Sequence, residues 1–270
     1  MKNNLLIGAC AAVLAVLGGI LIAMTPEPSE TVMTHSYQRC YNWYVMNGTG
    51  GQQPVAADDA LFKDNYRIAY MGDAAEKKIW LTFDLGYDNG NTELILDALK
   101  EKDVEGAFFI CGHVVETCPE LVKRMAEEGH AVCNHTEHHA DLSGLSEEEI
   151  SAEMTELEEK YTALTGRKMD KMMRPPEGKY SESSLEKLNN LGYTPVFWSF
   201  AYKDWIDDDQ PTEQAAIEKI LSNAHPGMVA LLHSTSATNA KILPEVIDRL
   251  RDKGYAFGTM DELRALANER

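Results

Sequence analysis

Hydrophobic residues from position 79 onward form short apolar runs that alternate with longer amphipathic stretches. Short apolar runs predict buried strands, whereas apolar residues at helical spacing among charged ones predict helices that pack on one face. The predicted strands span residues 79–83, 107–110, 131–134, 172–174, 194–200, 228–233 and 256–259. The predicted helices span residues 92–102, 120–128, 146–165, 181–191, 212–224, 243–253 and 261–267.

This alternation predicts an α/β fold built on a parallel sheet. About seven repeats of the unit predict a closed or nearly closed (β/α)7-type barrel over residues 79–270, although a doubly wound open sheet would give the same alternation. Residues 25–78 contain prolines and glycines that break regular elements, so we expect a linker and an irregular N-terminal extension there. Its aromatic residues are expected to anchor it on the domain surface; they are Tyr37, Tyr41, Trp43 and Tyr44.

Residues 1–24 predict a membrane anchor. Residues 5–24 are uncharged throughout, and a transmembrane helix needs about 20 such residues. Lys2 precedes this stretch and Glu27 follows it, so the positive-inside rule places the remaining chain outside the membrane. The first interpretation is a single-pass signal anchor in the cell membrane with an extracytoplasmic domain. The alternatives are secretion after signal cleavage and a lipoprotein modified at Cys10.

Composition excludes one class of partner. The formal net charge is −18, which argues against nucleic acid because phosphate binding requires a positive surface. Hydrophobic residues make up 44% of the chain, which is enough to form one large core. Cysteines beyond the anchor are free to form disulfides in an exported domain, but their number fixes no pairing; they are Cys40, Cys111, Cys118 and Cys133.

Polar side chains collect at the carboxyl ends of the predicted strands. In barrels and open α/β sheets these ends share one mouth, where the chemistry takes place. Each residue alone has a structural explanation, such as a helix cap or a satisfied core histidine, but that explanation must be repeated at five strand ends. The set comprises Asp84, the pair His135 and His139, Arg174, Asp204 and His233.

The two histidines of the pair indicate a metal site. His135 and His139 are four residues apart, so one helical turn would place both imidazoles on the same face. Two neutral imidazoles can hold a divalent metal ion and leave positions for water and substrate. Zn, Co and Mn all accept such ligands, and the sequence leaves the choice among them open.

The other members of the set suit a hydrolysis. Asp84 can take a proton from water, and His233 can protonate a leaving amine near neutral pH. Arg174 would keep the carboxylate base ionised, and Asp204 would keep an acid histidine protonated. We therefore predict metal-assisted hydrolysis at this mouth.

These residues, in this order, resemble the polysaccharide deacetylases of carbohydrate esterase family 4 over about residues 79–266. The matching motifs are Thr82-Phe83-Asp84, Asn134-His135 through His139, Arg174-Pro175-Pro176-Glu177-Gly178, Asp204-Trp205 and Leu231-Leu232-His233.

The resemblance implies a distorted barrel and a role for each matching position. It makes Asp84 the catalytic base and His233 the acid, with His135 and His139 as metal ligands. Arg174 would position the base. Glycan contacts are expected from Tyr87, Asn89, Pro176 and Trp205.

One position departs from the family pattern. Most members carry a second Asp in the first motif as a metal ligand, and this chain has Leu85 there. The following Gly86-Tyr87-Asp88-Asn89-Gly90 resembles the muramic δ-lactam branch, typified by sporulation deacetylases of Gram-positive bacteria, which also lacks that Asp. The resemblance thus implies deacetylation of N-acetylmuramic acid in peptidoglycan strands whose stem peptide has been removed.

Two other functions stay open from the sequence. The chain could deacetylate N-acetylglucosamine in peptidoglycan or chitin oligomers, with Leu85 incidental. It could also be a non-catalytic wall-binding homologue that lost its metal together with the second Asp. Retention of both an acid and a base speaks against the non-catalytic alternative, because a binding module needs neither.

Overall fold

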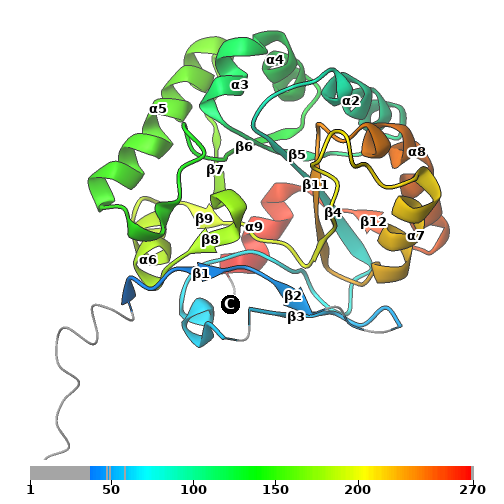
Figure 1. Ribbon diagram of the computed structural model, residues 1–270, viewed down its shortest axis with the longest axis horizontal. Coiled ribbons are helices and arrows are strands. Elements are labelled where there is room, and N and C mark those ends of the chain that lie inside the picture. The colour runs from blue at the N-terminus through cyan, green and yellow to red at the C-terminus, as the bar shows by residue number, and fades with distance from the viewer. Residues whose placement is uncertain (1–36, 47, 49, 58, 269–270) are drawn as a thin grey trace, which may run out of the picture.

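A strongly curled parallel sheet forms the centre of the computed structural model, which describes residues 37–46, 48, 50–57 and 59–268 (Figure 1). Every paired strand in this sheet is parallel to its neighbour. The predicted α/β fold with a parallel sheet is confirmed. In spatial order the strands are β10 (Phe200–Ala201), β11 (Met228–His233), β4 (Lys78–Leu85), β5 (Ala107–Ile110), β6 (Ala131–Asn134), β7 (Asp170–Met173) and β9 (Thr194–Pro195), and β12 (Ala256–Phe257) pairs with the start of β4.

Helices cover the outer face of the sheet (Figure 1). Apolar residues of the sheet and of these helices form one large buried core between them. A further helix, α9 (Met260–Asn268), instead packs Met260 and Leu263 against Trp80 in a second core. The covering helices are α2 (Asn91–Glu101), α3 (Gly112–Thr117), α4 (Pro119–Glu127), α5 (Glu147–Thr165), α7 (Glu213–Asn223) and α8 (Ala237–Asp252), and α6 (Glu182–Asn190) lies beside β9.

The alternation of side chains along β4 decides what faces the inside of the curl. Successive residues of a strand point to opposite faces. Phe83 and Leu85 belong to the core between sheet and helices, whereas Trp80 belongs to the inner core. Asp84, an even-numbered residue like Trp80, therefore points into the curl at the end of its strand.

The sheet is a half-barrel, because its two edge strands β9 and β10 do not pair with each other. The predicted single strand over residues 194–200 is wrong: β9 pairs with β7, β10 pairs with β11, and residues 196–199 cross from β9 to β10. An isolated parallel bridge joins Ala69 to Val196, and an antiparallel bridge joins Met71 to Met228 of β11. Residues 69–71 thus lie between the two edge strands beside residues 196–199, and we call residues 196–199 the seam.

The N-terminal extension runs along one side of the domain (Figure 1). Its described part packs as an integral layer, whereas we expected a linker and surface anchoring over residues 25–78. Trp43 is 5% exposed and belongs to an aromatic cluster with Tyr180 and Phe197. Its elements are β1 (Tyr41–Asn42), which pairs with β8 (Lys179–Tyr180), the hairpin of β2 (Val45–Met46) and β3 (Val55–Ala56), and the 3-10 helix η1 (Leu61–Asn65).

Two element boundaries differ from the prediction for local reasons. Helix α8 begins at Ala237, before the predicted start at residue 243, because the Ser236 side chain accepts from Asn239 N–H and caps the helix there. The predicted strand at residues 172–174 is displaced, because β7 ends before Arg174. The predicted anchor at residues 1–24 lies outside the described residues. Among the residues described, no helix is both long and apolar enough to span a bilayer.

Candidate active site

Strand register brings the predicted site residues to one edge of the sheet. His233 is the direct partner of Asp84 between β11 and β4. On the far side, Arg174 follows β7 and its backbone N–H donates to Asn134 O at the end of β6 (2.9 Å). The prediction that strand ends deliver these side chains to one mouth agrees with this arrangement.

The Asp84 carboxylate is held by the buried guanidinium of Arg174. Arg174 Nη1 lies 2.6 Å from Asp84 Oδ1, and Nη2 donates to Thr82 Oγ1 (2.8 Å). Its Nε donates to Val196 O (3.2 Å), and the guanidinium carbon lies 4.2 Å from the centre of the Phe109 ring. Arg174 is therefore fixed at every donor group and is fully buried.

The charge balance keeps Asp84 ionised. Burial by itself raises the pKa of this carboxyl, but the positive charge of Arg174 and the imidazoles of His135 and His233 outweigh it, so the Asp84 pKa lies below its ordinary value. Asp84 Oδ2 stays 3.6 Å from His135 Nε2 and takes no part in the contact with Arg174 Nη1. One carboxylate oxygen is thus left for a proton at the mouth.

A second buried pair lies beside the first. His233 Nδ1 is 2.7 Å from Asp204 Oδ1, and the other oxygen, Oδ2, accepts the His233 backbone N–H (2.9 Å) and Asn239 Nδ2 (2.6 Å). Burial opposes the charged imidazole, but the hydrogen bond and charge of Asp204 prevail, so the His233 pKa is raised. With Nδ1 engaged by Asp204, Nε2 is the nitrogen left to carry a proton to a ligand.

His135 and His139 lie close together without the predicted helical turn, which is wrong. Their ring centres are 5.0 Å apart, but Thr136 and His139 have φ values of 68° and 56°, in the left-handed region. Side chains replace the helical ladder: Asn134 Oδ1 accepts from Thr136 N (2.8 Å), and Thr136 Oγ1 accepts from Ala140 N (2.9 Å).

The histidine pair fits a divalent metal ion by its donor chemistry. His135 Nδ1 lies 2.8 Å from Arg174 O, which fixes the proton there and leaves the Nε2 lone pair free. Burial lowers the His135 pKa to about 4, so its imidazole is neutral at pH 7. His139 is exposed. The described residues hold no cluster of three or more His, Cys, Asp or Glu suited to a metal, so water and substrate would complete the coordination.

Helix α5 fastens the histidine loop from outside. Glu153 accepts the backbone N–H of His138 and pairs with its Nδ1, both at 2.9 Å. Glu137 is 5% exposed, and its Oε1 lies 2.5 Å from Lys160 Nζ. Gly112 makes room for this carboxylate, because a Cβ there would lie 2.1 Å from the Glu137 carboxyl atoms.

Packing in the core explains why position 85 is a leucine. Its side chain is fully buried in the core between sheet and helices, on the face of β4 opposite Asp84. An aspartate here would place a carboxylate among apolar side chains, where burial of an unpaired charge is costly. In this chain, position 85 is a core position.

Two exposed aromatic residues border the mouth. The Trp205 ring is 50% exposed and lies 5.6 Å from the His233 ring, centre to centre. Tyr87, 45% exposed, donates to Asp207 Oδ2 (3.1 Å), and Asn89 Nδ2 donates to Thr235 O (2.9 Å). The fourth predicted glycan contact, Pro176, is buried.

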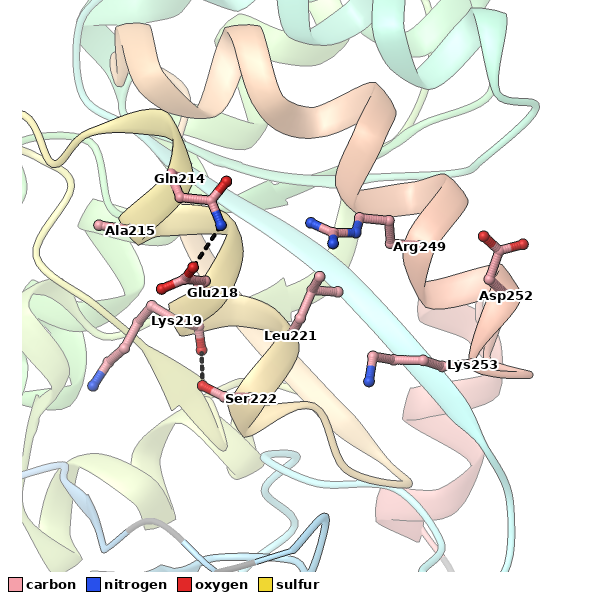
Figure 2. A pocket seen from close by; sticks show the side chains of 9 residues that line it. All are labelled: Gln214, Ala215, Glu218, Lys219, Leu221, Ser222, Arg249, Asp252 and Lys253. Carbon is pink, nitrogen blue, oxygen red and sulfur yellow. Dashed lines mark hydrogen bonds between the residues drawn. The ribbon is translucent and has the colours of Figure 1, made fainter.

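A broad groove on the described surface lies elsewhere. It has a volume of about 910 Å³ and runs between α7 and α8, lined by charged and polar side chains such as Glu218, Arg249 and Lys253 (Figure 2). None of its lining residues belongs to the strand ends described above. The candidate active site is therefore located by its buried ion pairs and not by this groove.

Sequence reasoning missed three supporting residues. Thr82 links Arg174 to the sheet, because its hydroxyl donates to Ala230 O (2.6 Å). Asn239 is 1% exposed and holds Asp204, while Asp207 ties down Tyr87. The role of Thr82 was predictable, because Thr82 lies two residues before Asp84 on the same strand and therefore on the same face of the sheet. Asn239 and Asp207 gave none, because each is an ordinary polar residue in a helix turn or loop.

Fold and site together define a hydrolase of the polysaccharide deacetylase class, carbohydrate esterase family 4, which acts on amide bonds of acetylated sugars. The polysaccharide deacetylase family model matches residues 71–196, and the chain belongs to this family.

Two relatives, one of which also has a solved structure, place the chain within the family. It is similar to the peptidoglycan-N-acetylmuramic acid deacetylase PdaA of Bacillus subtilis, with 38% identity over 255 residues, covering 94% of this chain and 93% of PdaA. The solved structure of B. subtilis PdaA, described as a family 4 carbohydrate esterase, superimposes with a TM-score of 0.80, 39% identity and coverage of 84% of this chain and 97% of PdaA. A peptidoglycan-N-acetylglucosamine deacetylase of Bacillus cereus is 33% identical over 211 residues, covering 77% of this chain and 75% of that protein.

Proposed function

We propose that this enzyme hydrolyses the N-acetyl group of N-acetylmuramic acid in peptidoglycan. The observation that carries the proposal is the pairing of an ionised carboxylate with a raised-pKa histidine on adjacent strands, Asp84 with Arg174 and His233 with Asp204. The N-acetylmuramic acid assignment is supported by the similarity to PdaA over 94% of the chain. The loop that follows Asp84 also supports it, because residues 86–90 resemble the muramic δ-lactam branch in sequence.

The two pairs divide the work of a hydrolysis. Asp84 takes a proton from the water that attacks the acetyl carbonyl carbon. Arg174 keeps the Asp84 carboxylate ionised and aimed, because it occupies Oδ1 and leaves Oδ2 for that proton. When the carbon–nitrogen bond breaks, His233 donates its Nε2 proton to the leaving nitrogen. Acetate and a free amine are the products.

His135 and His139 would hold the divalent metal ion. The ion, when bound, polarises the acetyl carbonyl and lowers the pKa of water at the site. His135 contributes a fixed lone pair, because its Nδ1–H donates to Arg174 O. The same backbone carbonyl therefore couples the metal ligand to the residue that holds the base.

The sugar chemistry gives the product a second step. N-acetylmuramic acid carries a lactyl carboxylate on the same ring as its acetamido group. Once the stem peptide is gone, the freed amine can attack that carboxylate, and loss of water closes a muramic δ-lactam of the spore cortex type. We propose an extracytoplasmic site of action, because peptidoglycan lies there and residues 5–24 form an apolar stretch.

The second candidate substrate is N-acetylglucosamine in peptidoglycan. The 33% identity to the B. cereus enzyme favours it, since that relative is named for this sugar. The two candidates differ in the lactyl group, and they are distinguished by the sugar that loses its acetyl group.

Acetate release tests the proposal. The protein is assayed with added Zn, Co or Mn on three substrates: intact peptidoglycan, peptidoglycan stripped of stem peptides by an amidase, and chitin oligomers. We expect metal-dependent release from the stripped glycan alone. Release from intact glycan or chitin oligomers would move the enzyme to the N-acetylglucosamine class, and silence on all three would contradict a deacetylase.

A further inference from the structure

We propose that Trp43 of the N-terminal extension is a positioning residue for the deacetylation, acting through Arg174. The inference rests on the proposed role of Arg174. Trp43 lies before the stretch that the family model matches, and the residues it fastens, Phe197 and Trp198, lie after it.

The need for such a residue comes from the seam of the half-barrel. Residues 196–199 cross between β9 and β10, and backbone bonds to the sheet hold them only at their ends, where Val196 N–H donates to Met173 O (2.7 Å) and Ser199 N–H donates to Val229 O (3.0 Å). Yet Val196 O is the acceptor for Arg174 Nε (3.2 Å), and the Trp198 ring lies 6.0 Å from the guanidinium. The geometry of Arg174 therefore depends on the Val196–Phe197 peptide, at the start of a stretch, Phe197 and Trp198, that no strand of the sheet holds.

Trp43 holds that segment by two contacts and the loop after Arg174 by a third. Its ring stacks on Phe197 with centres 4.2 Å apart and planes 14° apart. Its Nε1 donates to Trp198 O (2.8 Å), and its backbone N–H donates to Gly178 O (2.8 Å). Ala69 adds backbone bonds on the other side, donating to Pro195 O (2.9 Å) and accepting from Phe197 N (2.7 Å).

Gly178 lies where the loop after Arg174, the seam and the N-terminal extension pack against one another. Its φ is 67°, and a Cβ there would lie 2.6 Å from the Trp198 ring and 3.1 Å from Trp43 Cβ. The loop that follows Arg174, the seam and the extension thus meet with no room for a side chain. Loss of the Trp43 ring removes the stack on Phe197 and the hydrogen bond to Trp198 O, while the backbone bond to Gly178 O stays.

The test compares Trp43→Leu and Trp43→Phe with the matched variant Phe62→Leu. Phe62 belongs to the same aromatic cluster and contacts Tyr41 and Tyr180, but its ring contacts do not include the seam. We measure kcat and KM for acetate release, and thermal unfolding of each variant. We expect Trp43→Leu to lower kcat about tenfold to a hundredfold with KM within twofold, since small misplacements of a catalytic group cost this much. Trp43→Phe keeps the stack and recovers most of kcat.

A double-mutant cycle shows whether the effect passes through Arg174. In the Arg174→Lys background, Trp43→Leu should cost nothing further in kcat. Additive losses, or equal losses of kcat in Trp43→Leu and Phe62→Leu, would overturn the proposal.

The ¹⁵N signal of Arg174 Nε–H gives a reading that does not need activity. It is assigned by its absence in Arg174→Lys, and Trp43→Leu should shift it where Phe62→Leu does not. This separates the proposal from the proposed function: an inactive wild type with a Trp43-sensitive signal refutes the function alone. An unmoved signal refutes the positioning role.

Discussion

Replacing Asp204 by Asn should move the basic limb of the pH–rate profile to lower pH. The carboxylate accepts three hydrogen bonds and is fully buried. In Asp204→Asn, the single amide oxygen can satisfy the His233 backbone N–H and Asn239 Nδ2, which turns the amide NH₂ toward His233 Nδ1. A donor facing Nδ1 stabilises the neutral imidazole and removes the partner of the charged one.

The magnitude follows from the lost bond. A hydrogen bond to a charged group contributes about 1.5–3 kcal/mol, and one pKa unit corresponds to about 1.4 kcal/mol. The His233 pKa should therefore fall by about one to two units. Because His233 acts as the protonated acid, activity is lost as pH rises through its pKa, so the limb moves down by the same amount. At a pH above the wild-type limb, kcat/KM should be about tenfold to a hundredfold lower.

The assay is acetate release from amidase-stripped peptidoglycan at saturating metal across pH 5 to 10, with Asp208→Asn as the control. Asp208 is an exposed carboxylate of the same loop, so its loss should leave the limb in place. The pH dependence of thermal unfolding tests the direction of the His233 pKa shift independently of activity. A raised His233 pKa stabilises the fold fully below the unfolded pKa and loses that contribution as pH rises through the folded pKa. A uniform loss of activity in Asp204→Asn with an unmoved limb would refute the assignment of His233 as the acid.

Three further changes test other parts of the site. Leu85→Asp should destabilise the fold by about 3–5 kcal/mol in urea unfolding without raising activity, because it buries an unpaired charge; a gain of metal-dependent activity would contradict the core role of Leu85. His135→Ala should lose both bound metal, measured by elemental analysis, and acetate release, and retention of the metal would refute the ligand role. Trp205→Ala should raise KM roughly twofold to tenfold at nearly constant kcat, whereas a large fall in kcat would show that Trp205 takes part in the chemistry.

The sequence predicted the sheet and the site residues for the same reason. Buried parallel strands are continuous apolar runs, so β4, β5, β6 and β11 stand out. Their carboxyl ends share an edge, so Asp84 and His233 could be placed together before any coordinates.

Prediction failed where tertiary contacts replace local ones. The run over residues 194–200 is largely apolar, but the curl of the sheet separates β9 from β10 and leaves the seam between them. The histidine spacing fits a helical turn, yet the Asn134 and Thr136 side chains satisfy the backbone and open the loop. The extension looked loose because its glycines and prolines hide a core made with residues more than a hundred positions away, such as Trp43 with Phe197.

The central claim is that the Asp84 carboxylate starts the hydrolysis of the N-acetyl group of muramic residues. Its most direct test is mass analysis of the sugars released from amidase-stripped peptidoglycan after treatment with wild-type enzyme and Asp84→Asn, both metal-loaded. We expect muramic acid or its δ-lactam with the wild type, and unchanged N-acetylmuramic acid with an Asp84→Asn variant whose unfolding transition matches that of the wild type. Deacetylated glucosamine beside intact N-acetylmuramic acid, or full conversion by Asp84→Asn, would contradict it.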